Sequence, residues 1–153
     1  MRERFSTFNN LLEGVQLLNA QMVYEYVNTS AGLQMKKNTS FLLGKSFSDA
    51  HPGIEKSDFY KDLLVCLEQK TEKISVVEFQ HLDGSVSYYE MCIKPYSKGL
   101  LILSVDVSAQ KRLEKELELL NKKFEDELKE RMKNIVVNLE IELNKERKQQ
   151  QIV

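Results

Sequence analysis

The chain of 153 residues lacks tryptophan altogether and has only two cysteines, two histidines and two prolines. Cys66 and Cys92 are too few for a disulfide framework or a cysteine-based zinc site, and they suit a reducing compartment. No apolar run approaches the ~20 residues that a membrane-spanning helix needs, and the charged, polar start does not resemble a signal peptide. We therefore expect a cytoplasmic protein without membrane contact.

An excess of charge of one sign is also missing. Lys and Arg number 22 and Asp and Glu number 23, which leaves a net charge of −1. Such a balance gives no general attraction to a polyanion, so we expect no nucleic-acid partner. Hydrophobic residues make up 42% of the chain, which is enough for a globular core.

Helix breakers are confined to the first part of the chain. All six glycines and both prolines lie before residue 100, and charged residues of both signs are interspersed after Ser108. This composition predicts three segments: an amphipathic helix at 1–12, a folded domain at 13–107 and a long solvated helix at 108–153.

The folded segment has the pattern of a mixed α and β domain. Apolar alternation and turn signals, the clearest being Asp83-Gly84, predict strands at 15–19, 23–27, 74–80, 85–94 and 100–107. Asn28 and Ser57 are placed to cap helices between the second and third strands. The fold class is α+β: a five-stranded antiparallel sheet with flanking helices, followed by the long C-terminal helix.

Alternation along the strands predicts which side chains face the core. The core-facing apolar residues would line a candidate small-molecule pocket or would simply pack together, and the pattern fits both; they are Phe79, Tyr89, Met91, Leu101 and Leu103. The opposite face is too apolar for open water. Either the N-terminal helix covers it or it binds a partner.

The C-terminal helix carries one narrow apolar seam. The seam residues recur in steps of three and four and are Leu113, Leu117, Leu120, Phe124, Leu128, Met132, Ile135, Leu139 and Leu143. A stripe of this kind needs a second helix to cover it, so we expect a homodimeric coiled coil, with parallel and antiparallel pairing both open. Repeats of 11 residues favour a straight or slightly right-handed rod. The alternative is a helix that packs on its own domain.

Several short segments resemble the PAS family of domains. The run from Leu11 to Leu18, Leu42-Leu43-Gly44-Lys45, the hairpin around Asp83-Gly84-Ser85 and the closing 102–108 segment, ILSVDVS, match its elements in order and spacing. His51-Pro52-Gly53-Ile54-Glu55 is similar to a segment of PAS domains in bacterial sensor kinases. The resemblance covers roughly residues 5–112.

The resemblance implies a sensory or dimerisation module of a bacterial two-component or related signalling protein. Such a module relays a signal through a coiled coil to an output domain or a partner. In the family, the aspartate of the closing signature anchors the helix junction, which here is Asp106, with Ser108 as a candidate helix cap. Asp106 would then pair with Lys111 or Arg112, or with backbone amides. The alternative is a receptor for haem, flavin or a metabolite.

No catalytic or metal-binding constellation is found, so we expect neither an enzyme nor a metal site, and no resident cofactor. His51 precedes the helix that usually carries a haem ligand in this family, and His81, beside a turn, is expected at the surface. Cys66 lacks the motif of flavin photoreceptors. The tail has no histidine to accept a phosphoryl group, so the chain is either a fragment of a sensor kinase or other signalling enzyme, or a module that acts through partners.

Overall fold

The computed structural model describes residues 2–152, with side chains from Phe5 onward. Its single sheet has the strand order β2-β1-β5-β4-β3, and every neighbouring pair is antiparallel. The strands are β1 (Gly14–Leu18), β2 (Tyr24–Val27), β3 (Lys73–Gln80), β4 (Val86–Tyr96) and β5 (Gly99–Asp106). The predicted five-stranded antiparallel sheet is therefore confirmed.

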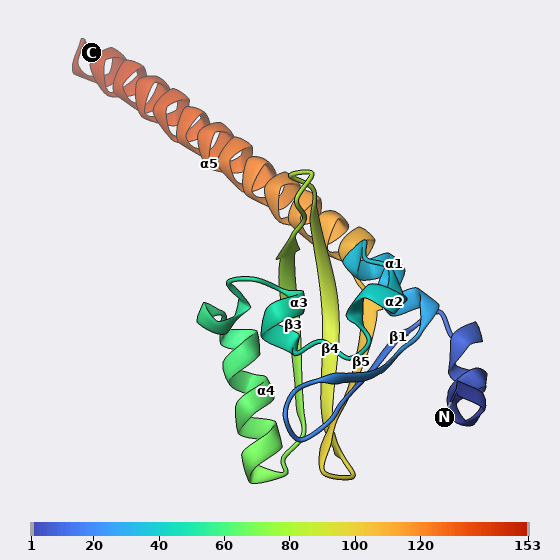
Figure 1. The fold of residues 1–153 in the computed structure, drawn as a ribbon. Coiled ribbons are helices and arrows are strands. Elements are labelled where there is room, and N and C mark those ends of the chain that lie inside the picture. Colours follow the sequence, from blue (N-terminus) through green and yellow to red (C-terminus); the bar gives the residue numbers. More distant parts are fainter. Residues whose placement is uncertain (1, 153) are drawn as a thin grey trace. The chain divides into compact units, whose positions relative to one another are not determined.

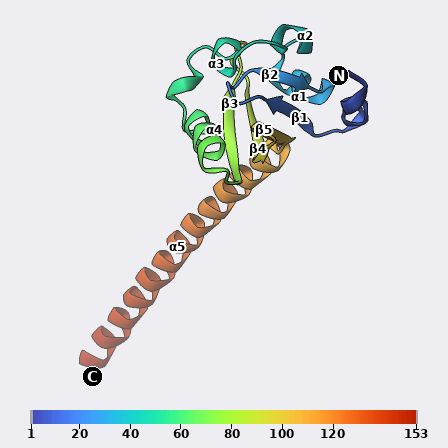
Figure 2. The same cartoon turned by 60° about the horizontal axis from the view of Figure 1, so that its bottom comes forward.

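The helices between β2 and β3 cover one face of the sheet (Figure 1), and the turned view in Figure 2 shows the same layer. They are α1 (Thr29–Met35), α2 (Thr39–Leu42), α3 (Phe47–Ala50), the 3-10 turn η2 (Ile54–Lys56) and α4 (Asp58–Gln69). Asn28 caps α1 by accepting from the N–H of Ala31, and Ser57 caps α4 by accepting from Tyr60 N–H. Both caps agree with the sequence prediction. Helix α3 and the turn η2 are too short to show a helical period of apolar residues in the sequence.

The two hairpins that follow α4 differ in their turns. Gly84, with φ at 82°, closes the β3–β4 hairpin, as the Asp-Gly pair predicts. The sequence places the next turn at 95–99, but β4 continues through Pro95 to Tyr96, which pairs with Gly99. Pro95 is tolerated because the pairing of β3 with β4 has already ended at Ile93, so no neighbour needs its missing N–H.

The core lies between the sheet and the helices. Its fully buried side chains include Tyr24, Leu42, Leu63, Ile93, Leu100 and Ile102. A bulge between Leu17 and Leu18 shifts the register of β1 against β2, so that Leu18 pairs with Tyr24 but Leu17 pairs with Tyr26. Tyr24 therefore belongs to the core, while Tyr26, two residues later, lies on the outer face of the sheet with Leu17.

The outer face is only partly covered. The N-terminal segment forms a 3-10 helix, η1 (Arg2–Asn10), rather than an amphipathic helix to residue 12. The rings of Phe5 and Phe8 pack on Tyr26, with centroid distances of 5.2 and 6.4 Å. Farther along the sheet, exposed apolar side chains remain on the outer face: Ile74, Val76 and Val105. The N-terminal segment thus covers part of this face, and a partner on the exposed remainder stays a prediction.

The chain divides into two compact units, residues 1–109 and 110–153. The second unit is the greater part of α5 (Ser108–Gln151), a continuous helix of 44 residues. At ~1.5 Å per residue this helix is roughly 65 Å long. Among residues 2–152, no helix combines the length and the apolar character needed to cross a membrane.

Candidate functional site

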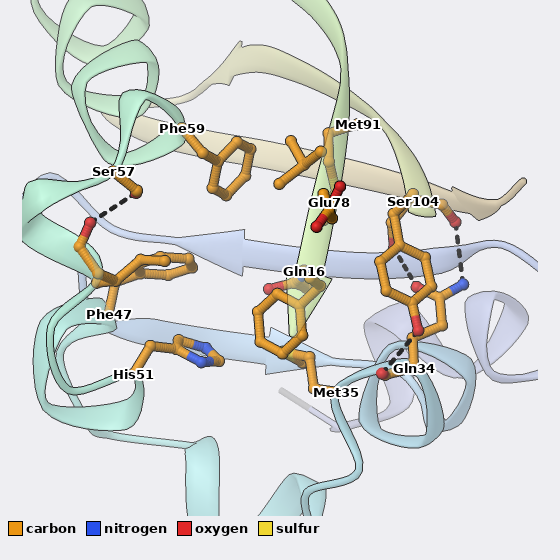
Figure 3. Close-up of a pocket in the computed structure, with 14 residues that line it drawn as sticks. Gln16, Gln34, Met35, Phe47, His51, Ser57, Phe59, Glu78, Met91 and Ser104 are labelled. Carbon is orange, nitrogen blue, oxygen red and sulfur yellow. Dashed lines mark hydrogen bonds between the residues drawn. The ribbon is translucent and has the colours of Figure 1, made fainter. Parts of the chain in front are cut away.

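A cavity of about 90 Å³ lies inside the first unit, between the sheet and α1–α4. Its walls are mostly apolar and come from both layers: Met35, Phe47, Ile54, Phe59, Val77, Phe79, Tyr89 and Met91. The polar residues that line it are Gln16, Gln34, His51, Ser57, Glu78 and Ser104. In Figure 3, Gln34 and Ser104 lie at one end of this cavity, and Phe47 and His51 lie at the other.

A chain of hydrogen bonds connects the sheet to the rim of the cavity. The hydroxyl of Tyr24 donates to Gln16 Oε1 over 3.0 Å and lies 2.9 Å from Nε2 of His51. Because this hydroxyl already donates its proton to Gln16, His51 Nε2 must carry a proton and donate to Tyr24. His51 Nδ1 is then the acceptor that faces the ammonium of Lys37, 3.4 Å away. The arrangement assigns a neutral imidazole to His51.

Burial and charge both favour that neutral form. Desolvation, with a smaller contribution from the positive charge of Lys37, lowers the pKa of His51 to about 4. Desolvation also raises the pKa of Tyr24 far above its usual range, so its phenol stays protonated. The relay from Gln16 to His51 is thus uncharged at neutral pH.

The opposite end of the cavity is closed by Gln34 of α1. Its amide nitrogen donates to the carbonyl of Ser104 over 3.3 Å, and its Oε1 accepts from the Ser104 hydroxyl. The backbone carbonyl of Gln34 accepts from the hydroxyl of Tyr89 over 2.9 Å. These bonds, drawn in Figure 3, join α1 to both β4 and β5 at the cavity wall.

Beyond His51 the cavity adjoins an open depression of about 700 Å³. The two spaces share lining residues, among them Met35, His51 and Phe79, so the depression is the outer continuation of the cavity. Its rim carries Lys36 and Asp83, which form an ion pair at 2.6 Å, and Lys37. The depression gives the inner cavity a polar mouth.

The structure brings together only part of the predicted pocket. Phe79, Tyr89 and Met91 line the cavity, as the alternation along their strands suggests. Leu101 and Leu103 do not line it, because β5 turns Leu100, Ile102 and Ser104 inward instead. The sequence predicts that residues 101, 103 and 105 face the core, because all three are apolar. In the structure Ser104 faces the core, where its hydroxyl donates to Gln34, and Leu103 lies on the outer face.

Sequence reasoning missed the polar lining of the cavity. Gln16 and Gln34 have no motif that separates them from surface glutamines, and only the fold places them inside. His81 corrects an expectation: it is buried rather than at the surface, packing on Phe79 with its Nε2 2.9 Å from Ser87 Oγ. The β3–β4 hairpin encloses it.

The junction between β5 and α5 is organised around Tyr88 of β4. The carbonyl of Tyr88 accepts from Val107 N–H at 2.8 Å, and its N–H donates to Ser108 Oγ at 2.9 Å. Asp106 Oδ1 accepts from the N–H of Ser108 at 2.9 Å, which is the pairing with a backbone amide considered from the sequence. Asp106 therefore satisfies the first N–H of α5, and the Ser108 hydroxyl bonds to β4 rather than to the end of the helix. Lys111 pairs with Glu114 instead.

All predicted seam residues of α5 are exposed in the single chain. Their exposed fractions range from 43% for Leu128 to 66% for Leu113. The set comprises Leu113, Leu117, Leu120, Phe124, Leu128, Met132, Ile135, Leu139 and Leu143.

Within residues 2–152, no cluster of three or more His, Cys, Asp or Glu side chains could hold a metal ion. Cys66 is buried in α4 and Cys92 is half-buried.

Comparison with solved structures finds the same fold in a PAS domain, in a light-oxygen-voltage receptor and in a domain of a sensor histidine kinase/response regulator. A PAS domain from Colwellia psychrerythraea is 14% identical, with a TM-score of 0.58, covering 71% of this chain and 97% of that one. An RNA-binding light-oxygen-voltage receptor is 11% identical, with a TM-score of 0.63, covering 78% of this chain and 36% of that receptor. A domain of a sensory box sensor histidine kinase/response regulator from Geobacter sulfurreducens is 12% identical, with a TM-score of 0.54, covering 67% and 90%. Similarity at this identity shows the fold alone.

No curated protein matches the chain. The family model described as the PAS fold matches residues 8–112, which is more than half of the chain and includes the sheet, the cavity and the junction. The chain therefore belongs to the PAS fold family.

Proposed function

We propose that this chain is the sensory and dimerisation module of a signal-transduction protein, which passes a change in its cavity through the β5–α5 junction to a coiled coil. The observation that carries the proposal is the position of Tyr88, whose backbone holds both Val107 and Ser108. Its chain neighbour Tyr89 lines the cavity. One strand of the sheet thus contacts the cavity and the first turn of α5 at consecutive residues.

A second covalent route supports the same coupling. Ser104 lines the cavity and binds Gln34, and Asp106, two residues later on β5, accepts from the N–H of Ser108, the first residue of α5. No glycine or proline lies between Ser104 and the end of α5, so no flexible residue separates strand from helix. A shift of β5 against α1 is therefore expected to move the first turn of α5.

The output of this module is a homodimeric coiled coil. An apolar seam that stays exposed over nine residues of one helix is unfavourable in water, and a second copy of the same helix would cover it. The outer face of the sheet offers a further contact between two copies, through its exposed residues Ile74, Val76 and Val105 and in addition to η1. Signalling proteins of the sensor-kinase type, acting in the cytoplasm, are the setting that we propose.

The module acts by binding and conformational change rather than by catalysis. Its polar cavity residues are engaged with one another, as in the Gln34–Ser104 and Tyr24–His51 pairs, and do not form a nucleophile with a general base. We propose that any enzymatic output belongs to another domain or to a partner.

Light scattering on the full chain tests the proposal. A dimer of about twice 17.8 kDa at micromolar concentration is expected. A mass equal to one chain over the whole concentration range would contradict the coiled-coil output.

A second candidate function is a receptor whose bound cofactor is itself the sensor, but the cavity gives it less support than the sensory module. Its volume is about 90 Å³, and both ring nitrogens of His51 are already engaged by Tyr24 and Lys37. A visible absorption spectrum of the purified protein decides between the two candidates. Haem or flavin bands would favour the cofactor receptor, whereas a colourless sample with the expected dimer mass would favour the sensory module without a coloured cofactor.

A further inference from the structure

Lys37, at the mouth of the cavity, is a cation without an acidic partner among residues 5–152. Its Nζ donates to the backbone carbonyl of Ala50 and lies 3.4 Å from His51 Nδ1. Its neighbour in the chain, Lys36, differs: it forms an ion pair with Asp83 at 2.6 Å. Lys37 is half-buried, whereas Lys36 is exposed. The mouth thus contains one inward, unpaired ammonium group.

The surroundings of Lys37 disfavour its charged form. Burial, followed by the positive charge of Lys45, lowers the pKa of the Lys37 ammonium. The neutral His51 accepts a hydrogen bond but supplies no negative charge. An anion placed beside Lys37 would offset both effects, because a partly buried ammonium gains most from a counter-charge where water is scarce.

The other charges at the mouth limit how negative that anion can be. Asp83 is neutralised by Lys36, and Glu78 lies next to Phe79 on β3 with an exposed side chain. Counting Lys36, Lys37, Glu78 and Asp83, the mouth has no surplus positive charge. Among the described residues at the mouth, the Lys37 ammonium is the one cation without an acidic partner, so it can neutralise a single carboxylate. A dicarboxylate or a phosphate would bring a second negative charge that has no partner there.

The inner cavity sets the size of the apolar part. An engineered protein cavity of about 150 Å³ accepts benzene, so the present cavity of about 90 Å³ is suited to a smaller group. Phe47, Phe59 and Met91 provide apolar walls for it. Gln16 also lines the cavity, and its Oε1 accepts from the hydroxyl of Tyr24, so this end of the wall is polar.

We propose that the cavity binds a small monocarboxylic acid with a short, branched alkyl body. Its carboxylate would pair with Lys37 at the mouth, and its alkyl group would fill the space between Phe47, Phe59 and Met91. The inference rests on the proposed sensory function, and it names the chemical class of the input.

Calorimetric titration of the full chain with three probes tests this ligand class. Isobutyrate, whose isopropyl body is smaller than benzene, is the acid, isobutyramide is its neutral analogue of the same shape, and phenylacetate has a larger ring. We expect the acid to bind at least about tenfold more tightly than the amide, as a charge-assisted hydrogen bond in a partly buried site provides. Phenylacetate should bind more weakly than isobutyrate.

Two matched lysine variants locate the effect. Lys37→Met should remove the preference for the acid over the amide, while Lys61→Met, which loses the same charge from an exposed ion pair on α4, should keep it. Equal affinity of acid and amide for the unaltered protein, or an undiminished preference in Lys37→Met, would overturn the proposal.

Light scattering on the same samples separates this inference from the proposed function. A dimer that shows no preference for the acid would overturn the ligand class and leave the coiled-coil output intact. A monomer that binds isobutyrate selectively would overturn the output and leave the ligand class intact.

Discussion

Ser108, the first residue of α5, is bound to Tyr88 in β4 through its side chain: Ser108 Oγ accepts from Tyr88 N–H at 2.9 Å and lies 3.4 Å from the Tyr88 carbonyl oxygen. Because Ser108 is buried, this bond is sheltered from water. The base of the helix is therefore fixed to the strand whose next residue, Tyr89, lines the cavity.

Removing this hydroxyl should weaken the first unit. Ser108→Ala leaves the N–H of Tyr88 without its side-chain acceptor, and we expect a loss of about 1–3 kcal/mol in the free energy of unfolding. Urea denaturation monitored by circular dichroism measures it. Asp106→Ala, which removes the acceptor of the Ser108 N–H, should cost ~1 kcal/mol, whereas Asp106→Asn, which still accepts a hydrogen bond, should cost less. Equal stability of Ser108→Ala and the unaltered chain would show that the contact is not stabilising.

His51 should make stability depend on pH. Its pKa is about 4 in the folded protein and 6.5 when exposed. Between these values the unfolded chain binds a proton that the folded chain does not, so the free energy of unfolding falls as the pH falls from 6.5 towards 4. The loss is about 3 kcal/mol, and it is absent above pH 6.5.

Denaturant titrations at a series of pH values check this dependence. His51→Gln removes the group and should flatten the slope between pH 4 and 6.5. The matched control is His81→Gln, which removes the other buried histidine but keeps His51, and should therefore retain that slope. An unchanged slope in His51→Gln would assign the pH dependence to other groups.

The seam of α5 predicts a contrast between two neighbouring leucines. Leu117 lies on the seam and is 59% exposed in the single chain, and Leu119, which is 71% exposed, lies off it. Leu117→Lys should weaken the dimer, since each chain loses an apolar burial of ~1.5–3 kcal/mol. Leu119→Lys introduces the same charge and should leave the dimer intact. Sedimentation velocity measures both, and equal effects would mean that the seam is wrongly assigned.

Gly99 should tolerate substitution less well than Gly84. A Cβ built at Gly99 would lie 1.8 Å from the backbone oxygen of Leu18, so Gly99→Ala must displace β1 or β5. A Cβ at Gly84 meets nothing within 4 Å, and its cost comes only from a φ of 82°, roughly 1–2 kcal/mol. We expect Gly99→Ala to lower the melting temperature more than Gly84→Ala. The reverse order would contradict the close strand approach.

The orientation of β5 provides a further test. Ile102 is fully buried in the core, and Leu103 is half-buried on the outer face. Ile102→Ala should cost about 2–5 kcal/mol, within the range for core truncations, and Leu103→Ala should cost less. Denaturation of the two variants compares the faces directly, and a larger loss for Leu103→Ala would reverse the assignment.

Local chemistry allowed much of the fold to be predicted. Asn and Ser are common helix caps just before an amphipathic run, and Asn28 and Ser57 both act in this way. Asp83-Gly84 closes a hairpin because glycine accepts a positive φ. Strand β4 was assigned its correct face because Tyr89, Met91 and Ile93 alternate with more polar neighbours. These signals act over a few residues and need no distant partner.

The cavity depended on contacts between segments far apart in the chain. Ser104 faces inward because Gln34, 70 residues earlier, satisfies its hydroxyl, and hydrophobicity alone placed Leu101 and Leu103 there instead. The bulge at Leu17 likewise decides which tyrosine of β2 enters the core. The order of elements, the caps and the apolar seam were determined by the sequence itself, since neighbouring residues set helix and strand periods. Strand faces, buried hydrogen bonds and the unpaired Lys37 were decided only by the tertiary structure, because a polar group can be buried only where folding brings it a partner.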